Sequence, residues 1–277
     1  MAEIDLEAEY NNRERVPDHP ELIAGWAKDA DDYRKARPDA KLDQVYGPSP
    51  RNLFDFFPAQ DGSPAQRLTA LFIHGGYWQA LDKSFFSHMA RGMNTRGFDV
   101  VIANYSLCPT ISVDGITSEM RQLAAHVHRL TGRKLSVFGH SAGGHLTAAL
   151  MATDWSAHEM PSDLVTAAMP VSGLFDLAPL VPTSVNKALG LDEASARAAS
   201  PISAPKPSSG RYIAVVGGAE SSEYLRQSRL LTSLWQGPAL SGELDILEGA
   251  NHFTVILPFA DPSSTLVASL AGISSTL

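Results

Sequence analysis

Residues 135–151 carry the sequence LSVFGHSAGGHLTAALM. The apolar run Leu135–Phe138 predicts a buried strand, and the alanine- and leucine-rich run after Ser141 predicts a helix. The small residues between them permit a sharp strand-to-helix turn, which would strain Ser141 and expose its hydroxyl. Free N–H groups at the start of the helix would face developing negative charge. We therefore predict that Ser141 is a nucleophile, the alternative being a serine that only caps the helix.

A second glycine-rich segment, HGGYW at residues 74–78, follows the apolar run 68–73. Adjacent glycines let a backbone approach a substrate closely. Acyl transfer needs fixed N–H donors for the oxyanion of its tetrahedral intermediate. We expect these donors to be the N–H groups of Gly76 and Tyr77, or of Gly75 and Gly76, together with that of Ala142. A plain glycine turn after a strand is the alternative interpretation.

The general base is expected late in the chain. A serine on such a turn is followed in chain order by an acid and then by a histidine. Of the nine histidines, only His252 lies beyond residue 158, and it comes just after a candidate last strand. Elimination therefore assigns the base to His252, which would take the hydroxyl proton of Ser141. No pair of histidines has the spacing of metal ligands, so no metal is predicted.

The acid that orients the histidine is expected after the predicted strand 212–216. Its task is to accept the imidazole N–H, fix the tautomer and stabilise the imidazolium. Glu220 lies nearer the strand end and is preferred over Glu223, which suits the first turn of a helix. Asp176 and Asp245 are more distant competitors.

The rest of the chain alternates apolar runs with amphipathic helical stretches, which is typical of a mostly parallel sheet flanked by helices. Two short segments bounded by prolines, 44–46 and 53–57, suit an antiparallel edge. Further strands are expected at 68–73, 98–103, 135–138, 166–171, 212–216 and 244–247. Helices are expected at 85–95, 116–130, 142–153 and 222–235.

We expect one domain over residues 1–277, with two segments that could cover the site. Residues 1–41 have helical character, with a helix opened by Pro20. Residues 172–209 lie between two predicted strands and end in a Pro/Ser-rich run, which favours a cap insertion. With the serine turn, the pattern predicts the α/β-hydrolase fold.

The composition limits the classes of partner that the protein is expected to have. The net charge of −8 disfavours nucleic acid. The single cysteine, Cys108, allows no intrachain disulfide, and the acidic N-terminus lacks the apolar core of a signal peptide. No apolar stretch is long enough to span a bilayer. We expect a cytoplasmic protein with a small-molecule substrate and no membrane or nucleic-acid partner; the oligomeric state is not predicted.

Five segments together resemble the kynurenine formamidase (arylformamidase) family. They are EYNNR at 9–13, HGGYW at 74–78, GHSAGGH at 139–145, ESSEYLRQS at 220–228 and NHF at 251–253. The resemblance implies a triad of Ser141, Glu220 and His252, with glutamate where the family commonly has aspartate. It also implies hydrolysis of N-formylkynurenine to kynurenine and formate, without a cofactor.

An aromatic leaving group would need an apolar wall, for which Tyr77, Trp78 and Phe253 are candidates; each could equally be core. A broad carboxylesterase, or a hydrolase of another amide or carbamate, would share the same triad. A non-catalytic ligand-binding protein of this fold is a further alternative. It predicts a damaged triad or oxyanion loop, whereas both are intact in the sequence.

Overall fold

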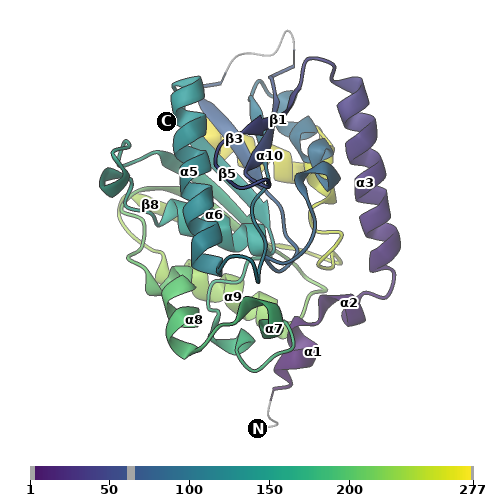
Figure 1. The fold of residues 1–277 in the computed structure, drawn as a ribbon, viewed down its shortest axis with the longest axis vertical. Coiled ribbons are helices and arrows are strands. Elements are labelled where there is room, and N and C mark those ends of the chain that lie inside the picture. The colour runs from purple at the N-terminus through teal and green to yellow at the C-terminus, as the bar shows by residue number, and fades with distance from the viewer. Residues whose placement is uncertain (1–3, 61–65, 276–277) are drawn as a thin grey trace.

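The computed structural model describes residues 4–60 and 66–275, and one eight-stranded sheet runs through it (Figure 1). The strand order is β1-β2-β4-β3-β5-β6-β7-β8. The bounds are β1 Lys41–Val45, β2 Leu53–Phe57, β3 Leu68–Ile73, β4 Val100–Ala103, β5 Lys134–His140, β6 Val165–Val171, β7 Gly210–Gly217 and β8 Leu240–Leu247.

The sheet is parallel from β4 to β8 and antiparallel at one edge. β1 pairs antiparallel with β2, and β2 pairs antiparallel with β4. All remaining neighbours are parallel. The predicted fold class is confirmed, including the antiparallel edge formed by the two segments that prolines bound.

Helices cover both faces of this sheet. Leu71 and Ile73 pack with α5, α6 and α9, whereas Ala70 and Phe72 pack with α3, α4 and α10, as the two-residue period of a strand requires. The helices are α1 Leu6–Tyr10, α2 Asn12–Arg15, α3 His19–Ala36, α4 Arg91–Asn94, α5 Val113–Thr131, α6 Ala142–Met151, α7 Asn186–Leu189, α8 Glu193–Ala199, α9 Ser222–Leu234 and α10 Thr265–Ser275.

The predicted helix 85–95 is wrong as a continuous element. The structure has two 3₁₀ turns, η1 (Lys83–Phe85) and η2 (Ser87–Ala90), before the single turn of α4. Phe86 and Met89 are both fully buried. Three residues per turn place them on the same side, facing the core, which explains the tighter winding.

Two further elements differ from the sequence prediction. β8 begins at Leu240, four residues before the predicted start at Leu244, and Leu240 is the only one of its eight residues that is buried. An edge strand of this kind carries little apolar signal in its first half. The helix α10 was not predicted, although Leu266, Val267 and Leu270 bury its apolar side.

The chain segments before β1 and between β6 and β7 meet at the lower end of the molecule in Figure 1. There α1 and α2, in purple, lie beside α7 and α9, in green. The Glu7 carboxylate accepts hydrogen bonds from the backbone N–H and the hydroxyl of Ser184, at 2.7 and 2.6 Å. These contacts join the N-terminal helices to the segment that leads into α7.

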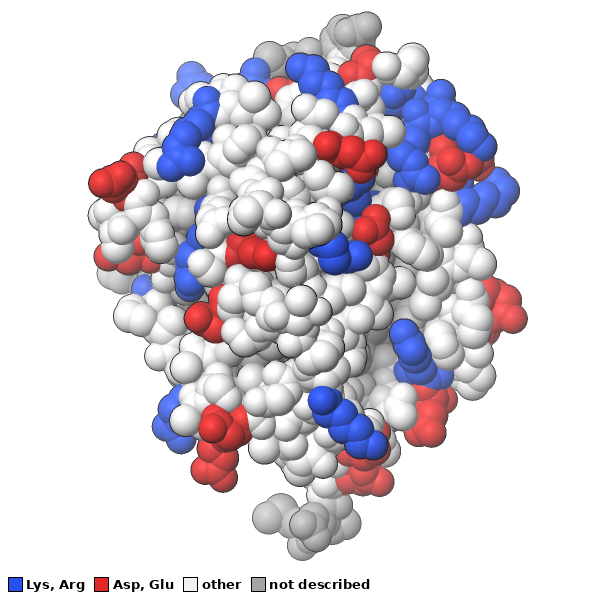
Figure 2. Space-filling model, viewed as in Figure 1, with Lys and Arg blue, Asp and Glu red and all other residues white. Residues whose placement is uncertain are grey.

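The surface is mixed in charge on the face that Figure 2 draws, where basic and acidic side chains are interspersed. Across the described ranges, no helix has both the length and the apolarity to cross a membrane.

Candidate active site

Ser141 stands between the last residue of β5 and the first residue of α6, at φ 57° and ψ −116°. Such a backbone conformation is strained for a residue with a side chain. Neighbouring backbone bonds hold it, since Ser141 N–H donates to Val171 O at 2.8 Å. A Cβ added at Gly143 would lie 1.9 Å from the carbonyl oxygen of Ile73, so only glycine lets the turn pack against the end of β3. The structure thus contains the sharp turn that the sequence predicts.

The loop 74–78 lies directly against this serine. A Cβ added at Gly75 would be 3.0 Å from Ser141 Cβ and 2.9 Å from the carbonyl oxygen of His140. Tyr77 and Trp78 have φ values of 50° and 56°, which turn the loop sharply at this point. The close approach of two backbones is therefore what the glycine pair makes possible.

The predicted oxyanion donors have no partner in the protein. Within residues 4–60 and 66–275, the N–H groups of Gly75, Gly76, Tyr77 and Ala142 have no protein acceptor. Ala142 is the first residue of α6, whose N–H points out of the helix. Gly76 and Tyr77 line the same cavity as Ser141, whereas Gly75 does not, and Ala142 directly follows Ser141.

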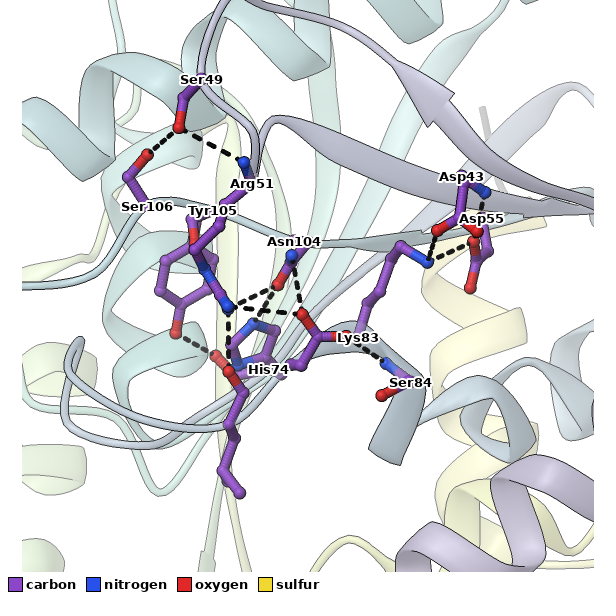
Figure 3. A network of polar contacts seen from close by, with 12 residues as sticks. Asp43, Ser49, Arg51, Asp55, His74, Lys83, Ser84, Asn104, Tyr105 and Ser106 are labelled. Carbon is purple, nitrogen blue, oxygen red and sulfur yellow. Dashed lines mark hydrogen bonds and ion pairs between the residues drawn. The ribbon is translucent and has the colours of Figure 1, made fainter.

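The side chain of His74 supports the start of the loop 74–78 (Figure 3). Its Nδ1 lies 2.7 Å from Gly75 O and its Nε2 lies 3.2 Å from Asn104 Oδ1. The ring stacks on Tyr105 at 4.3 Å, and the Tyr105 hydroxyl donates to His74 O at 2.8 Å. Complete burial lowers the pKa of His74 to about 4, so the imidazole is neutral at neutral pH. His74 therefore orients the loop.

Arg51 extends this support. Its guanidinium donates to Asn104 Oδ1 at 2.9 Å, to Leu81 O at 2.8 Å and to Tyr105 O at 2.8 Å (Figure 3). It therefore ties Leu81, at the far end of the segment after β3, to Asn104 and Tyr105 in the segment after β4. Sequence reasoning missed Arg51, Asn104 and Tyr105, because no local pattern links them to the loop.

His252 and Glu220 form a buried pair. His252 Nδ1 lies 2.6 Å from Glu220 Oε2, and the Glu220 side chain is 0% exposed. The other carboxylate oxygen accepts from Ser172 Oγ at 2.5 Å and from Gly217 N–H at 2.7 Å. Three donors thus fix the carboxylate against the imidazole, an arrangement that orients a general base.

His252 and Ser141 line one cavity of about 380 Å³. No hydrogen bond joins Ser141 Oγ to His252 in the described structure; such contacts commonly tighten only when substrate is bound. Tyr77 and Phe253 also line the cavity. Trp78 does not line it: the side chain is fully buried and packs against His145 at 5.0 Å.

The rival acids point elsewhere. Glu223 accepts from the Tyr10 hydroxyl at 2.6 Å and from Arg226 at 2.7 and 2.8 Å. Burial alone would raise the pKa of Glu223, but the hydrogen bonds from Arg226 and Tyr10 outweigh it and hold the pKa below its usual range. Asp176 faces Arg226 at 3.6 Å, and Asp245 lies within β8.

His140 has a role that sequence reasoning missed. Its Nε2 lies 2.8 Å from the carbonyl oxygen of His252, which can only accept, so this nitrogen carries the proton. Burial, with a smaller contribution from nearby His252, lowers the pKa of His140 well below its usual value. A neutral imidazole therefore holds the backbone of the residue predicted to be the base.

No cluster of three or more His, Cys, Asp or Glu side chains suited to a metal ion occurs in the described part of the chain.

Comparison with known proteins places the site in context. A kynurenine formamidase from Danio rerio is 30% identical over 238 residues, which cover 83% of this chain and 80% of the relative. A kynurenine formamidase from Salmo salar is 32% identical over 201 residues, covering 69% of this chain and 67% of the relative. The chain belongs to the kynurenine formamidase family. No family model matches it.

Solved structures share the fold of this chain. A protein from Silicibacter sp., described as a candidate thioesterase, is 32% identical with a TM-score of 0.88, covering 97% of this chain and all of that one. Esterase B from Lactobacillus rhamnosis has a TM-score of 0.68 at 16% identity, covering 94% and 96% of the two chains, and so shares the fold. This member of the kynurenine formamidase family is a serine hydrolase.

Proposed function

We propose that the enzyme hydrolyses N-formylkynurenine, a formanilide, to kynurenine and formate. The observation that carries the proposal is the Glu220–His252 pair at 2.6 Å, on the cavity that also contains Ser141. The relatives from fish and from Drosophila melanogaster, the last being 26% identical, are named kynurenine formamidases, which supports a formamide of this kind as the substrate.

The proposed first step forms a formyl-enzyme. His252 takes the proton of Ser141 as Oγ attacks the formyl carbon, and Glu220 stabilises the resulting imidazolium. The N–H groups of Gly76, Tyr77 and Ala142 would hold the oxyanion. The C–N bond then breaks as His252 gives its proton to the aniline nitrogen. In the second step, water attacks the formyl ester through the same base, and formate leaves with Ser141 regenerated.

The cavity suits a small acyl group and an aromatic leaving group. Its lining includes the aromatic side chains of Trp26, Tyr77 and Phe253, with Ile23 and Leu81 beside them. A volume of about 380 Å³ is within the range of small-molecule sites. Tyr77 and Phe253 are therefore the aromatic residues that we assign to the leaving group, while Trp78 supports the fold from the core.

We further infer that the chain forms a single catalytic domain and that two of its segments cover the site. Residues 172–209 contribute Ser184 and Val185 to the cavity, and the N-terminal 41 residues contribute the side from Glu7 to Trp26. The first segment would serve as the cap and the second as the N-terminal cover. The lone thiol of Cys108, which is buried and unpaired, suits the reducing interior of the cytoplasm.

The proposal is tested by steady-state kinetics on purified enzyme. We expect kcat/KM for N-formylkynurenine to exceed that for phenyl acetate and acetanilide, with kynurenine appearing in step with formate. If the purified enzyme hydrolyses simple esters but no formanilide, the formamidase assignment is contradicted and only the assignment as a serine hydrolase remains.

A thioesterase is the second candidate, since the Silicibacter protein described in that way matches over its whole length with a TM-score of 0.88. Short acyl thioesters, added to the same panel, separate the candidates. A preference for acetyl or larger thioesters over formanilides would favour this reading, or a broad carboxylesterase if oxygen esters react equally well.

A further inference from the structure

The N-terminal wall of the cavity carries one cation and one anion. Arg13 and Glu7 both line the cavity that holds Ser141 and His252. Among the described residues that line it, Arg13 is the only lysine or arginine. The cavity also has an aromatic side, where Trp26 stacks on Phe253 at 5.9 Å between ring centroids.

Arg13 has no protein partner in the described ranges, either as an ion pair or as a hydrogen bond. Its neighbour Arg15 is different, because Arg15 lies 3.9 Å from Glu9 and does not line the cavity. A guanidinium that faces a ligand cavity with all five donors free is suited to a carboxylate, which it can bind with two parallel hydrogen bonds.

Glu7 is held in place without being neutralised. The N–H and hydroxyl of Ser184 donate to its two oxygens, and these bonds lower the pKa of Glu7 below the usual range. No ion pair of Glu7 is present within the described residues. The carboxylate therefore remains charged at neutral pH, with lone pairs left for a cation.

The wall has a fixed position relative to the oxyanion loop. Asn12, which precedes Arg13, donates to the hydroxyls of Tyr224 at 2.8 Å and Tyr77 at 3.3 Å. The Tyr77 hydroxyl donates to Tyr10 O at 2.5 Å, so Tyr224 must supply the proton of the bond that joins the two hydroxyls at 2.7 Å. These bonds connect the helix carrying Arg13 to Tyr77, whose backbone N–H is one of the predicted oxyanion donors.

We propose that the N-terminal wall is a binding site for a zwitterionic α-amino acid group on the leaving group, with Arg13 binding its carboxylate and Glu7 its ammonium. The inference rests on the proposed function, because N-formylkynurenine carries such a group on a short chain ortho to its formamide. It goes further in assigning selectivity to residues outside the catalytic machinery, on α1 and α2.

A set of four formanilides tests the site. All carry the same ortho ketone chain, which ends in both charged groups, in the carboxylate alone, in the ammonium alone or in neither. Arg13→Gln should lower kcat/KM roughly 10- to 100-fold for the two substrates with a carboxylate and leave the other two unchanged. Glu7→Gln should lower it selectively for the two substrates with an ammonium, by a smaller factor.

Ratios of kcat/KM between the four substrates separate an effect on substrate binding from an effect on protein folding. Arg13 is exposed and unpaired, so its substitution should not affect stability. Glu7→Gln weakens the contact with Ser184, but that loosening would act on all four substrates alike. Arg15→Gln, which removes a positive charge from the same helix outside the cavity, is the matched control and should leave every ratio at its wild-type value.

Two outcomes would overturn the inference. In one, Arg13→Gln alters all four substrates equally; in the other, Arg15→Gln reproduces its selectivity. If the wild type cleaves none of the formanilides, the proposed function fails, and aryl acetates with the same four ortho chains then test the wall. Selectivity for the zwitterion among those esters would support the site, and its absence would refute it.

Discussion

Ser141, Glu220 and His252 follow the carboxyl ends of the parallel strands β5, β7 and β8, whereas residues 6–15, in and around α1 and α2, contribute another part of the cavity lining. We call the first region the catalytic floor and the second the N-terminal cover. In the floor, backbone segments approach so closely that a Cβ at Gly143 would overlap a carbonyl oxygen. In the cover, Tyr10 and Asn12 are held by hydrogen bonds between side chains.

The difference separates chemistry from selectivity. A change in the floor disturbs the packing of several strand ends together, which a well-packed core resists. A hydrogen bond in the cover contributes about 1 kcal/mol, and its loss can alter one wall without disturbing the sheet. We therefore expect substitutions in the floor to reduce turnover and substitutions in the cover to change which substrate is bound.

The strongest test of the floor is Ser141→Ala. We expect turnover to fall by about a millionfold, because the variant lacks the attacking oxygen. Labelling by a serine-directed organophosphorus reagent should disappear, while circular dichroism shows an unchanged fold. The matched control is Ser228→Ala, since Ser228 is buried in α9 and its hydroxyl has no partner. Retained labelling and activity in Ser141→Ala would move the nucleophile elsewhere.

A pair of glutamates compares the two regions directly. Glu220→Gln should lower kcat by a few thousandfold, because an amide next to His252 Nδ1 favours the wrong tautomer. Glu223→Gln weakens bonds from Tyr10 and Arg226, so it should mainly raise KM. Steady-state kinetics on both variants measure this difference. A larger loss of kcat in Glu223→Gln would reverse our assignment of the acid.

The turn around Ser141 and the parallel sheet could be predicted from the sequence because their signals are local. The turn around Ser141 is encoded by consecutive small residues between a strand and a helix, and the parallel sheet by alternating apolar runs. His252 followed from chain order and elimination. The catalytic roles of these residues stay predictions. Their closeness in space depends only on the ends of parallel strands meeting at one edge of the sheet, and the strand order brings those ends together.

The cover could not be predicted in the same way. Tyr10 and Glu223 are 213 positions apart, and no local pattern marks them as partners. From sequence, Glu223 was a rival acid, because an acidic residue in the first turn of a helix suits both roles. The expectation for Trp78 had a similar weakness: an aromatic residue beside a catalytic loop can face substrate or core, and this one is buried.

The effect of acid on stability gives a further comparison. Residues 1–15 contain no histidine, whereas buried neutral histidines lie elsewhere in the molecule. Burial lowers the pKa of His88 to about 4, and neither ring nitrogen has a hydrogen-bond partner among the residues that the structure describes. The unfolded chain, with a histidine pKa near 6.5, therefore binds more protons between these values, and stability falls as pH decreases through this window.

Replacing this histidine should reduce the acid sensitivity. Between pH 7 and pH 5, His88→Leu should lose about 2 kcal/mol less unfolding free energy than the wild type. Urea unfolding at both pH values measures the difference. His158→Leu, which replaces an exposed histidine in the 3₁₀ turn Trp155–His158, is the control and should follow the wild type. Equal pH dependence in all three proteins would show that His88 titrates normally when folded.

The smallest expected effect tests how the cover is attached. Tyr10→Phe removes one hydroxyl that donates to Glu223 at 2.6 Å and accepts from Gln227 at 3.0 Å, while the ring still packs on Tyr224. Glu223 keeps Arg226, and Gln227 keeps the N–H groups of Phe175 and Asp176, so the helix α9 stays in place.

The free energy that holds the N-terminal cover in place should fall by about 1 kcal/mol in Tyr10→Phe. As a result, KM for N-formylkynurenine should rise roughly fivefold, with kcat nearly unchanged. The control is Tyr212→Phe, because the Tyr212 hydroxyl donates to Trp235 O at 2.8 Å, away from the cavity. That variant should lose a similar amount of unfolding free energy but keep its KM. An equal rise of KM in both would mean that general destabilisation explains the effect. A fall of kcat in Tyr10→Phe alone would mean that the cover supports the catalytic floor itself, and the two regions could no longer be treated as independent.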